Sequence, residues 1–177
     1  MESSDGRPDF AYDDPGTLPP GPHVVYGRAS GWQMGLTPDV TFKGYTPVVN
    51  GPIAGVGDVN ADAMVDVVTG PGPGAAAPVR IHAGDAPTEF TAFAGAGGTN
   101  VAVGNFDEDA DLEIVAAVAS GGPPSVRVFQ PDGTPMAAAF SAYETGFGGG
   151  VRVAAGDVNG DGVDEIVTAP GPGRAPT

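Results

Sequence analysis

The stretch Asp157-Val158-Asn159-Gly160-Asp161-Gly162-Val163-Asp164-Glu165 indicates the fold of this chain more directly than any other. Oxygen-bearing side chains occupy its first, third, fifth and ninth positions, and Gly occupies the sixth. A hard cation takes about six to eight oxygen ligands, and a chain that turns tightly at Gly supplies them from alternating positions. The next residues, Ile166-Val167-Thr168-Ala169, are mostly β-branched and predict a strand. We therefore interpret the stretch as a metal-binding loop that leads into a β-strand.

The same pattern occurs twice more upstream. Residues 58–66 lead into Val67-Val68-Thr69, and residues 105–113 lead into Ile114-Val115-Ala116. The loops begin at residues 58, 105 and 157, which gives a period of about 50 residues. A period of that length is typical of propeller blades or of another repeat array.

Each repeat contains four short predicted strands separated by turns. After the loop and its strand come a Gly/Pro turn, an alternating strand such as Val79-Arg80-Ile81-His82, and an aromatic segment such as Phe140-Ser141-Ala142-Tyr143. A Gly cluster and a short apolar strand complete the unit, and no segment has helical periodicity. The sequence predicts an all-β, β-propeller-like array of four-stranded blades, with about three full repeats plus a half repeat. The predicted units are 23–56, 57–103, 104–155 and 156–177.

The amino-terminal part fits this template less closely. His23-Val24-Val25-Tyr26 aligns with the alternating strand, Val40-Thr41-Phe42 with the aromatic segment, and Ile53-Ala54-Gly55-Val56 with the closing strand. Residues 1–22 are expected to be a degenerate or poorly ordered half-repeat, because Met1 and Ser3 stand where the first and third ligands belong. We assign no metal to that segment.

The charge balance supports metal loading and argues against some partners. The chain has 22 acidic and 7 basic residues and a net charge of −15, and more than half of the acids lie in the three loops. Carboxylates so crowded repel one another unless a cation neutralises them. Such a charge disfavours a nucleic acid partner. No apolar run approaches the ~20 residues of a membrane span, and the absence of cysteine excludes thiolate metal sites.

The segment from Gly146-Phe147-Gly148 through the Asp157 loop to Thr168-Ala169-Pro170-Gly171 resembles the FG-GAP repeat of integrin α-subunits. It is closer still to the VCBS-type repeats of bacterial extracellular proteins. This resemblance implies a β-propeller at an extracellular or cell-surface location, with calcium in each loop. In each loop the implied ligands are the side chains at positions one, three, five and nine and the backbone carbonyl at position seven. They are Asp157, Asn159, Asp161, Val163 and Glu165 in the first quoted loop; Asp58, Asn60, Asp62, Met64 and Asp66 in the second; and Asn105, Asp107, Asp109, Asp111 and Glu113 in the third.

The loops depart from the pattern in two respects. Ala63 and Ala110 stand where Gly is expected, which disfavours a left-handed turn residue. Asn105 replaces a charged first ligand, so we expect occupancy to fall from the Asp157 loop to the Asp58 loop to the Asn105 loop. An EF-hand is disfavoured, because the twelfth position of the Asp157 loop is Thr168, where a bidentate Glu belongs.

The repeat count leaves the assembly open. Three full units and the opening half of another would leave strand edges unpaired, whereas propellers typically have about 4–8 blades and close into a ring. One hypothesis is that the chain is a fragment or a closed ring. The other is that the amino-terminal strands of another copy complete the open half, which builds a ring or a filament by self-association.

Catalysis finds little support in the sequence. The two histidines, His23 and His82, lie on predicted strands, and the chain has neither a nucleophile elbow nor a Gly-rich phosphate loop followed by a helix. We expect a non-enzymatic calcium-binding extracellular protein that acts as a structural or adhesive module for a protein or glycan. One alternative is a subunit of a surface filament or layer, and another is an accessory domain of a secreted hydrolase.

Overall fold

The computed structural model describes residues 53–173, apart from 76, 84–86, 96, 108 and 110, together with two short strands at 23–24 and 40–41. The chain divides into two compact units, Met1–Pro47 and Val48–Thr177, and each is described by itself. The half-repeat predicted at residues 1–22 lies outside the described residues.

The described residues form strands and turns, which confirms the predicted all-β class. Among these residues, no helix has the length and apolar character needed to cross a membrane. In the amino-terminal unit, β1 (His23–Val24) pairs antiparallel with β2 (Val40–Thr41). The carboxy-terminal unit contains the strands β3 (Ile53–Gly57), β4 (Asp66–Gly70), β5 (Val79–His82), β6 (Thr88–Phe90), β7 (Thr99–Gly104), β8 (Glu113–Val118), β9 (Ser125–Phe129), β10 (Phe140–Ser141), β11 (Val151–Gly156) and β12 (Glu165–Pro170).

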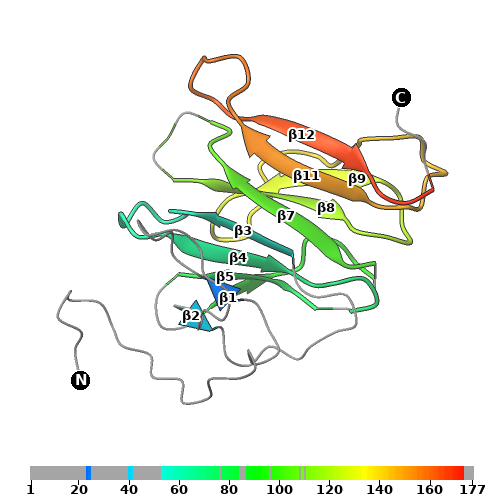
Figure 1. Cartoon of the computed structure of the whole chain (residues 1–177), viewed down its shortest axis with the longest axis horizontal. Coiled ribbons are helices and arrows are strands. Elements are labelled where there is room, and N and C mark those ends of the chain that lie inside the picture. Colours follow the sequence, from blue (N-terminus) through cyan, green and yellow to red (C-terminus); the bar gives the residue numbers. More distant parts are fainter. Residues whose placement is uncertain are drawn as a thin grey trace, which may run out of the picture. The chain divides into compact units, whose positions relative to one another are not determined.

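The ten strands that the structure describes in the carboxy-terminal unit form three sheets. The first sheet has the order β3-β4-β5-β6, the second has the order β7-β8-β9-β10, and the third is the pair β11-β12. All neighbouring strands are antiparallel and consecutive in sequence. The first strands of the sheets, β3, β7 and β11, lie side by side in that order (Figure 1). This arrangement is consistent with propeller-blade-like units.

The sheets begin one strand earlier than the predicted repeat units. β3, β7 and β11 start the three sheets, whereas the sequence places them at the ends of the preceding units. A repeat pattern shows how long a unit is but not at which strand the unit begins. Strand pairing shows where each sheet begins, because β3, β7 and β11 each hydrogen-bond to the strand that follows the loop.

Two hydrophobic layers hold the sheets together. The layer between the first and second sheets includes Val68, Val79, Ile81, Val101, Ile114, Ala116 and Phe129. The layer between the second and third sheets includes Val115, Ala117, Val126 and Val151. Side chains of successive strand residues point to opposite faces, so β8 contributes alternately to both layers and is buried at every position. Its continuous apolar run is typical of a strand covered on both faces.

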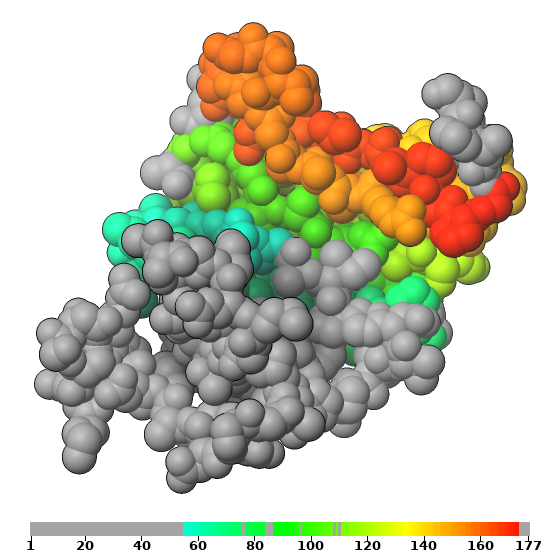
Figure 2. Space-filling model, in the orientation of Figure 1, coloured from blue at the N-terminus to red at the C-terminus, as the bar shows by residue number. Residues whose placement is uncertain are grey.

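The third sheet is much less buried than the other two. None of the β12 residues is fully buried, whereas every residue of the corresponding strands β4 and β8 is. Figure 2 shows β11 and β12 at the surface of the molecule, beyond the strands of the second sheet.

The Gly clusters that precede β7 and β11 allow the turns of adjacent sheets to approach closely. Gly150 has a φ of +86°, and a Cβ atom there would lie 1.8 Å from the Ala119 carbonyl oxygen. Gly98 has a φ of +74°, and its Cβ would lie 2.6 Å from Pro73 N. Both positions therefore require Gly for backbone conformation and for space.

Candidate metal centres

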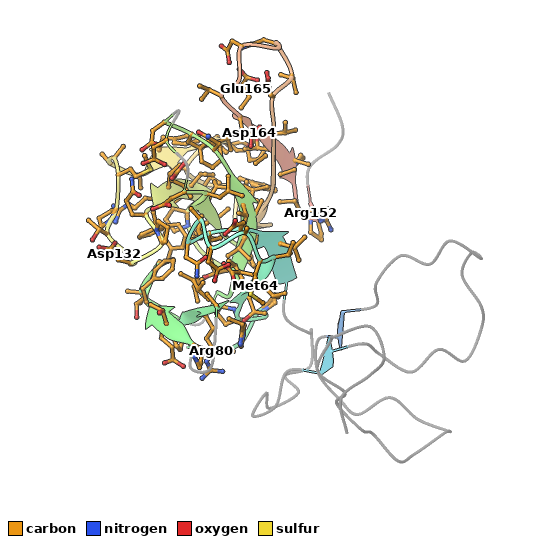
Figure 3. All side chains as sticks on the ribbon, turned by 90° about the vertical axis from the view of Figure 1, so that its left-hand side faces the viewer. Met64, Arg80, Asp132, Arg152, Asp164 and Glu165 are labelled. Atoms are coloured by element: carbon orange, nitrogen blue, oxygen red, sulfur yellow. The ribbon has the colours of Figure 1, made fainter. Side chains whose placement is uncertain are left out.

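The three predicted loops connect the first and second strands of the three sheets, at the same end of the carboxy-terminal unit (Figure 1). The ninth-position carboxylates Asp66, Glu113 and Glu165 are the first residues of β4, β8 and β12. The predicted sequence of loop and strand is therefore confirmed. Asp164 and Glu165 lie at the loop end of the third sheet, and Arg152 lies toward the other end (Figure 3).

Each ninth-position carboxylate closes its own loop. One of its oxygens accepts a hydrogen bond from the backbone N–H of the second loop residue: Val59 N to Asp66 Oδ2 at 3.0 Å, Phe106 N to Glu113 Oε2 at 2.7 Å, and Val158 N to Glu165 Oε2 at 2.9 Å. These bonds hold the start of the loop against the start of the next strand. The other carboxylate oxygen has different surroundings in Glu113 and in Glu165.

The Asn105 loop assembles the clearest cluster of acidic ligands. Carboxylate oxygens of Asp107, Asp109 and Glu113 all lie within 4.8 Å of one another. Glu113 is fully buried, and its Oε1 has no hydrogen-bond partner among the described residues. Burial raises the pKa of the Glu113 carboxyl above its ordinary value, and the charges of Asp107 and Asp109 raise this pKa further. The hydrogen bond from Phe106 N–H opposes that rise.

This arrangement fits a bound cation. An ionised carboxylate that is buried without a partner is costly, and so is the approach of three carboxylates to one another. A hard cation removes both costs, because it binds the unpaired oxygen and neutralises the neighbouring charges. The cluster could hold a metal, with Asp107, Asp109 and Glu113 as the residues that bind it.

The Asp157 loop has the same backbone pattern in a more exposed setting. Asp157 Oδ1 accepts hydrogen bonds from Gly160 N at 2.6 Å and Asp161 N at 3.2 Å, and Asp157 Oδ2 accepts one from Gly162 N at 3.0 Å. These backbone bonds lower the pKa of Asp157 below its ordinary value. Glu165 Oε1 accepts a hydrogen bond from Asn159 Nδ2 at 2.5 Å, so this oxygen has a protein partner.

The Asp58 loop shows how alanine replaces glycine. Ala61 and Ala63 have φ values of 54° and 66°, in the left-handed region that Gly160 and Gly162 occupy in the Asp157 loop. The expectation that Ala63 disfavours a left-handed residue is therefore wrong, because hydrogen bonds within the loop hold Ala63 in that conformation. Asp58 Oδ2 accepts a hydrogen bond from Ala63 N at 2.8 Å, and this bond needs the tight turn.

A further bond recurs in all three loops. The fifth-position carboxylate accepts a hydrogen bond from the seventh-position N–H: Met64 N to Asp62 Oδ1 at 2.8 Å, Asp111 N to Asp109 Oδ1 at 2.9 Å, and Val163 N to Asp161 Oδ1 at 2.9 Å. The third-position side chain likewise accepts from the fifth-position N–H in each loop. The described residues of the three loops thus share these two bonds and the bond to the ninth-position carboxylate. The seventh-position carbonyls remain predicted ligands.

Two side chains near the Asn105 loop were not predicted from the sequence. Gln130 follows β9, and its Nε2 lies 3.4 Å from Asp107 Oδ2. Asp164 belongs to the next loop, and its Oδ2 accepts a hydrogen bond from Asn105 N at 3.0 Å. Asp164 therefore links the second and third sheets. No sequence pattern identifies Gln130. Asp164 occupies the eighth position of its loop, a position that recurs in every repeat and could have been considered for contacts between repeats.

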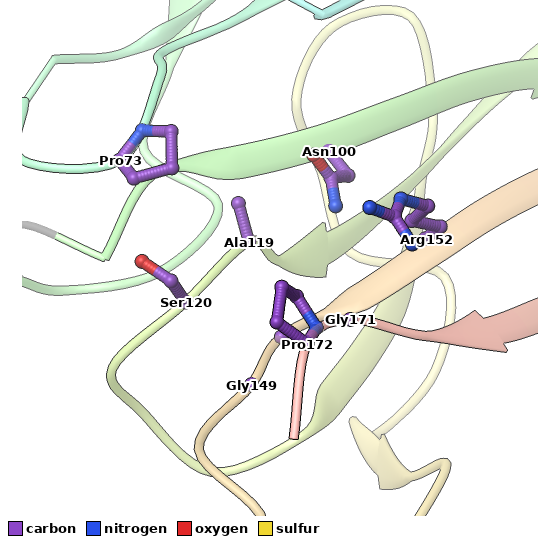
Figure 4. Close-up of a pocket in the computed structure, with 9 residues that line it drawn as sticks. Pro73, Asn100, Ala119, Ser120, Gly149, Arg152, Gly171 and Pro172 are labelled. Atoms are coloured by element: carbon purple, nitrogen blue, oxygen red, sulfur yellow. The ribbon is translucent and has the colours of Figure 1, made fainter. Parts of the chain in front are cut away.

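A pocket of about 510 Å³ lies where the turns of the three sheets come together, away from the metal loops. Figure 4 shows Pro73, Ala119, Ser120 and Pro172 from these turns around it, with Asn100 and Arg152 from the first strands of the second and third sheets. Asn100 Nδ2 donates to the Val151 carbonyl oxygen at 2.5 Å, and Asn100 Oδ1 has no partner among the described residues. Arg152 is exposed, and its Nη1 donates to the Pro170 carbonyl oxygen at 3.2 Å.

Comparison with known proteins identifies one repeat. Residues 149–176, which contain β11, the Asp157 loop and β12, match the FG-GAP repeat. No curated protein and no solved structure matches the chain. FG-GAP repeats often bind Ca²⁺ and are typically non-catalytic. The match suggests a β-propeller-type module with a binding or structural role.

Proposed function

We propose that this protein is a non-catalytic, calcium-binding repeat module that acts outside the cell in a structural or adhesive role. The buried, unpartnered Oε1 of Glu113 beside Asp107 and Asp109 is the observation that carries the proposal. The repetition of the same hydrogen-bonded loop in the first and third sheets extends it from one site to three.

Calcium suits these loops better than other common metals. The candidate ligands are carboxylate, amide and carbonyl oxygens, which hard cations prefer over softer transition metals. Mg²⁺ demands near-ideal octahedral geometry, whereas Ca²⁺ accepts higher and less regular coordination. The loops carry many oxygen atoms at irregularly placed positions of one turn, so they favour the larger ion.

The metal has a structural task in this proposal. Each loop joins the first two strands of a sheet, and the ninth-position carboxylate is the first residue of the second of them. A cation held by the loop and by that carboxylate would fix the strand pair. It would also relieve repulsion within a chain of net charge −15.

An extracellular location is part of this proposal, and the exposure of the Asp157 loop supports it. The first six residues of the Asp157 loop are exposed, and Asp157 already accepts hydrogen bonds from the loop backbone. Such a site is expected to bind weakly, within the range of about 10⁻⁴–10⁻³ M that extracellular calcium modules use. A protein or glycan partner would then bind a surface that calcium keeps rigid.

Isothermal titration calorimetry on the chelator-treated full chain tests this function. We expect saturable heat with CaCl₂, weaker heat with MgCl₂, and a higher melting temperature with calcium. Glu113→Gln should lower the calcium affinity. Asp132→Asn, which changes an exposed carboxylate outside the loops, should not. If the wild-type chain showed no calcium heat and no thermal shift, the proposed function would be wrong.

A further inference from the structure

The Asn105 loop and the Asp157 loop contact each other directly. Asp164, at the eighth position of the Asp157 loop, lies against Asn105, the first residue of the other loop. The Asp164 N–H donates to the Asn105 carbonyl oxygen at 2.6 Å, and Asp164 Oδ2 accepts a hydrogen bond from Asn105 N at 3.0 Å. Both main-chain polar groups of Asn105 are therefore bound to one residue of the neighbouring loop.

Two peptide groups join the predicted ligands of these loops. The Val163 carbonyl is the predicted seventh-position ligand of its loop, and it belongs to the same peptide group as the Asp164 N–H. The Asn105 carbonyl, which accepts from that N–H, shares a peptide group with the Phe106 N–H. The Phe106 N–H in turn donates to Glu113 Oε2 at 2.7 Å. The other Glu113 oxygen, Oε1, is the buried oxygen that has no partner among the described residues. A continuous path of hydrogen bonds thus leads from one predicted site to the other.

Such a path transmits the effect of a bound cation in two ways. A cation on a carbonyl oxygen polarises the peptide group, so the N–H of that group becomes a stronger donor, and hydrogen bonds in a chain strengthen one another. A cation also orders the loop that binds it. An ordered Asp157 loop fixes Asp164, and Asp164 then fixes Asn105, so less order has to be gained when the second cation binds.

The position of Asn105 matters for the acidic ligands of its own loop. Asn105 Oδ1 accepts a hydrogen bond from Asp107 N at 3.3 Å, and Asn105 Nδ2 donates to the Asp109 carbonyl oxygen at 2.9 Å. Asp107 and Asp109 carry the carboxylates that lie close to Glu113. A residue that holds Asn105 in place therefore helps to hold the whole cluster.

The described residues show no equivalent link between the first and second sheets. Leu112 has the position of Asp164 in the Asn105 loop, and its side chain packs against the apolar layer between those sheets. A Cβ atom on Gly57 would lie 2.8 Å from Leu112 Cδ1, so the corresponding contact is apolar. Among the described backbone hydrogen bonds, none joins Leu112 N to the Asp58 carbonyl. The hydrogen-bonded link is thus a property of the junction between the second and third sheets.

We infer that Asp164 is a positioning residue that couples the Asn105 and Asp157 loops, so that calcium in either loop raises the calcium affinity of the other. The inference rests on the proposed function, since it takes calcium as the ion that both loops bind. Coupling between two binding sites is reciprocal, so the factor is the same in both directions. Repulsion between the two bound cations acts against the coupling, and salt weakens this repulsion.

Calcium titration of the isotope-labelled full chain, followed by NMR, measures the two loops separately. The Phe106 amide signal reports the Asn105 loop, because its N–H donates to Glu113. The Gly162 amide signal reports the Asp157 loop, because its N–H donates to Asp157. Each signal gives the calcium concentration at which its own loop is half filled, which is the midpoint of that loop.

Two matched variants impair one loop at a time. Asp109→Asn and Asp161→Asn each remove one charged ligand at the fifth position and keep a side-chain oxygen for the bond from the seventh-position N–H. The coupling is visible in the loop that fills second, because the other loop is already occupied at that midpoint. This midpoint should rise about fivefold when the other loop is impaired, which is at the low end of usual couplings between sites.

Three further variants assign the coupling to Asp164. Asp62→Asn makes the same change in the Asp58 loop and should leave both midpoints within about twofold of the wild type. Asp164→Leu removes the acceptor for the Asn105 N–H and gives the eighth position the side chain that Leu112 has. In the Asp164→Leu chain the shift caused by impairing the other loop should fall below about twofold. Asp164→Asn, which keeps an oxygen acceptor, should retain the shift.

The outcomes separate the coupling from the proposed function. Calcium-dependent signals whose midpoints stay within about twofold in both Asp109→Asn and Asp161→Asn would overturn the coupling alone. These two variants change exposed side chains, so they test the coupling even if Asp164→Leu does not fold. A full shift that persists in the Asp164→Leu chain would show that charge carries the effect without Asp164, which also overturns the inference. If neither amide signal of the wild-type chain responded to calcium, the proposed function would fail and the coupling with it.

Discussion

β8 and β12 have almost the same sequence and very different surroundings. Each begins with Glu-Ile-Val and follows a metal loop of the same hydrogen-bonded form. β8 pairs with a strand on both sides, and its side chains pack against the first and third sheets. Within the described part of the chain, β12 pairs with β11 alone. The comparison shows that the strands and sheets beside a strand decide how deeply its side chains are buried, even when the sequence of the strand is nearly the same.

The largest expected difference between the two strands concerns their first apolar residue. Ile114→Ala should lower the free energy of unfolding by about 3 kcal/mol, since Ile114 is 0% exposed and the substitution leaves a cavity. Ile166→Ala should cost about 1 kcal/mol, because Ile166 is only partly buried and water can reach the site. Urea denaturation followed by circular dichroism measures both values. Equal losses would show that the third sheet is as tightly packed as the second.

The ninth-position glutamates provide the next comparison. Glu113→Gln should weaken calcium binding at its loop at least about tenfold, or about 1.4 kcal/mol. It removes a buried charge that has two acidic neighbours. Glu165→Gln should have a smaller effect, since Glu165 Oε1 already has Asn159 as a partner. Calorimetry on the two single variants measures the difference, and a larger loss at Glu165 would contradict the ranking.

The left-handed residues of the loops distinguish the first sheet from the third. Ala63→Gly should stabilise the protein by up to about 1 kcal/mol, because Ala63 has a φ of 66°. Gly162→Ala should destabilise it by about 1 kcal/mol, since Gly162 has a φ of 96°. Thermal melts of both variants, with and without calcium, measure these effects. Opposite signs are the expected result, and a loss from both substitutions would show that Ala63 is not strained.

The smallest effect is expected at Val167. Val167→Ala should change the free energy of unfolding by less than about 0.5 kcal/mol, because the side chain is 48% exposed. Urea denaturation measures the change, and Ala154→Ser on the same face of β11 is a mild control. A loss as large as that of Ile166→Ala would contradict this expectation.

The sequence by itself determined the repeat, the all-β class and the position of each loop before its strand. These features are local. A run of oxygen ligands with glycines encodes a turn, and the β-branched residues after it encode a strand, whatever lies beside them. The three clustered carboxylates of the Asn105 loop, Asp107, Asp109 and Glu113, were all predicted as ligands. The expected order of occupancy, with the Asp157 loop first, stays a prediction.

Only the tertiary structure decided which loops have a buried ninth-position carboxylate, Asp66 and Glu113, and which has the more exposed Glu165. Glu113 and Glu165 occupy the same position of the motif. The third sheet covers one face of β8, which begins with Glu113, whereas β12, which begins with Glu165, remains half exposed. Likewise, nothing in the sequence distinguishes the open Gly156 from the covered Gly57 and Gly104. The physical reason is that desolvation and packing depend on atoms supplied by other repeats, and a motif does not specify its neighbours.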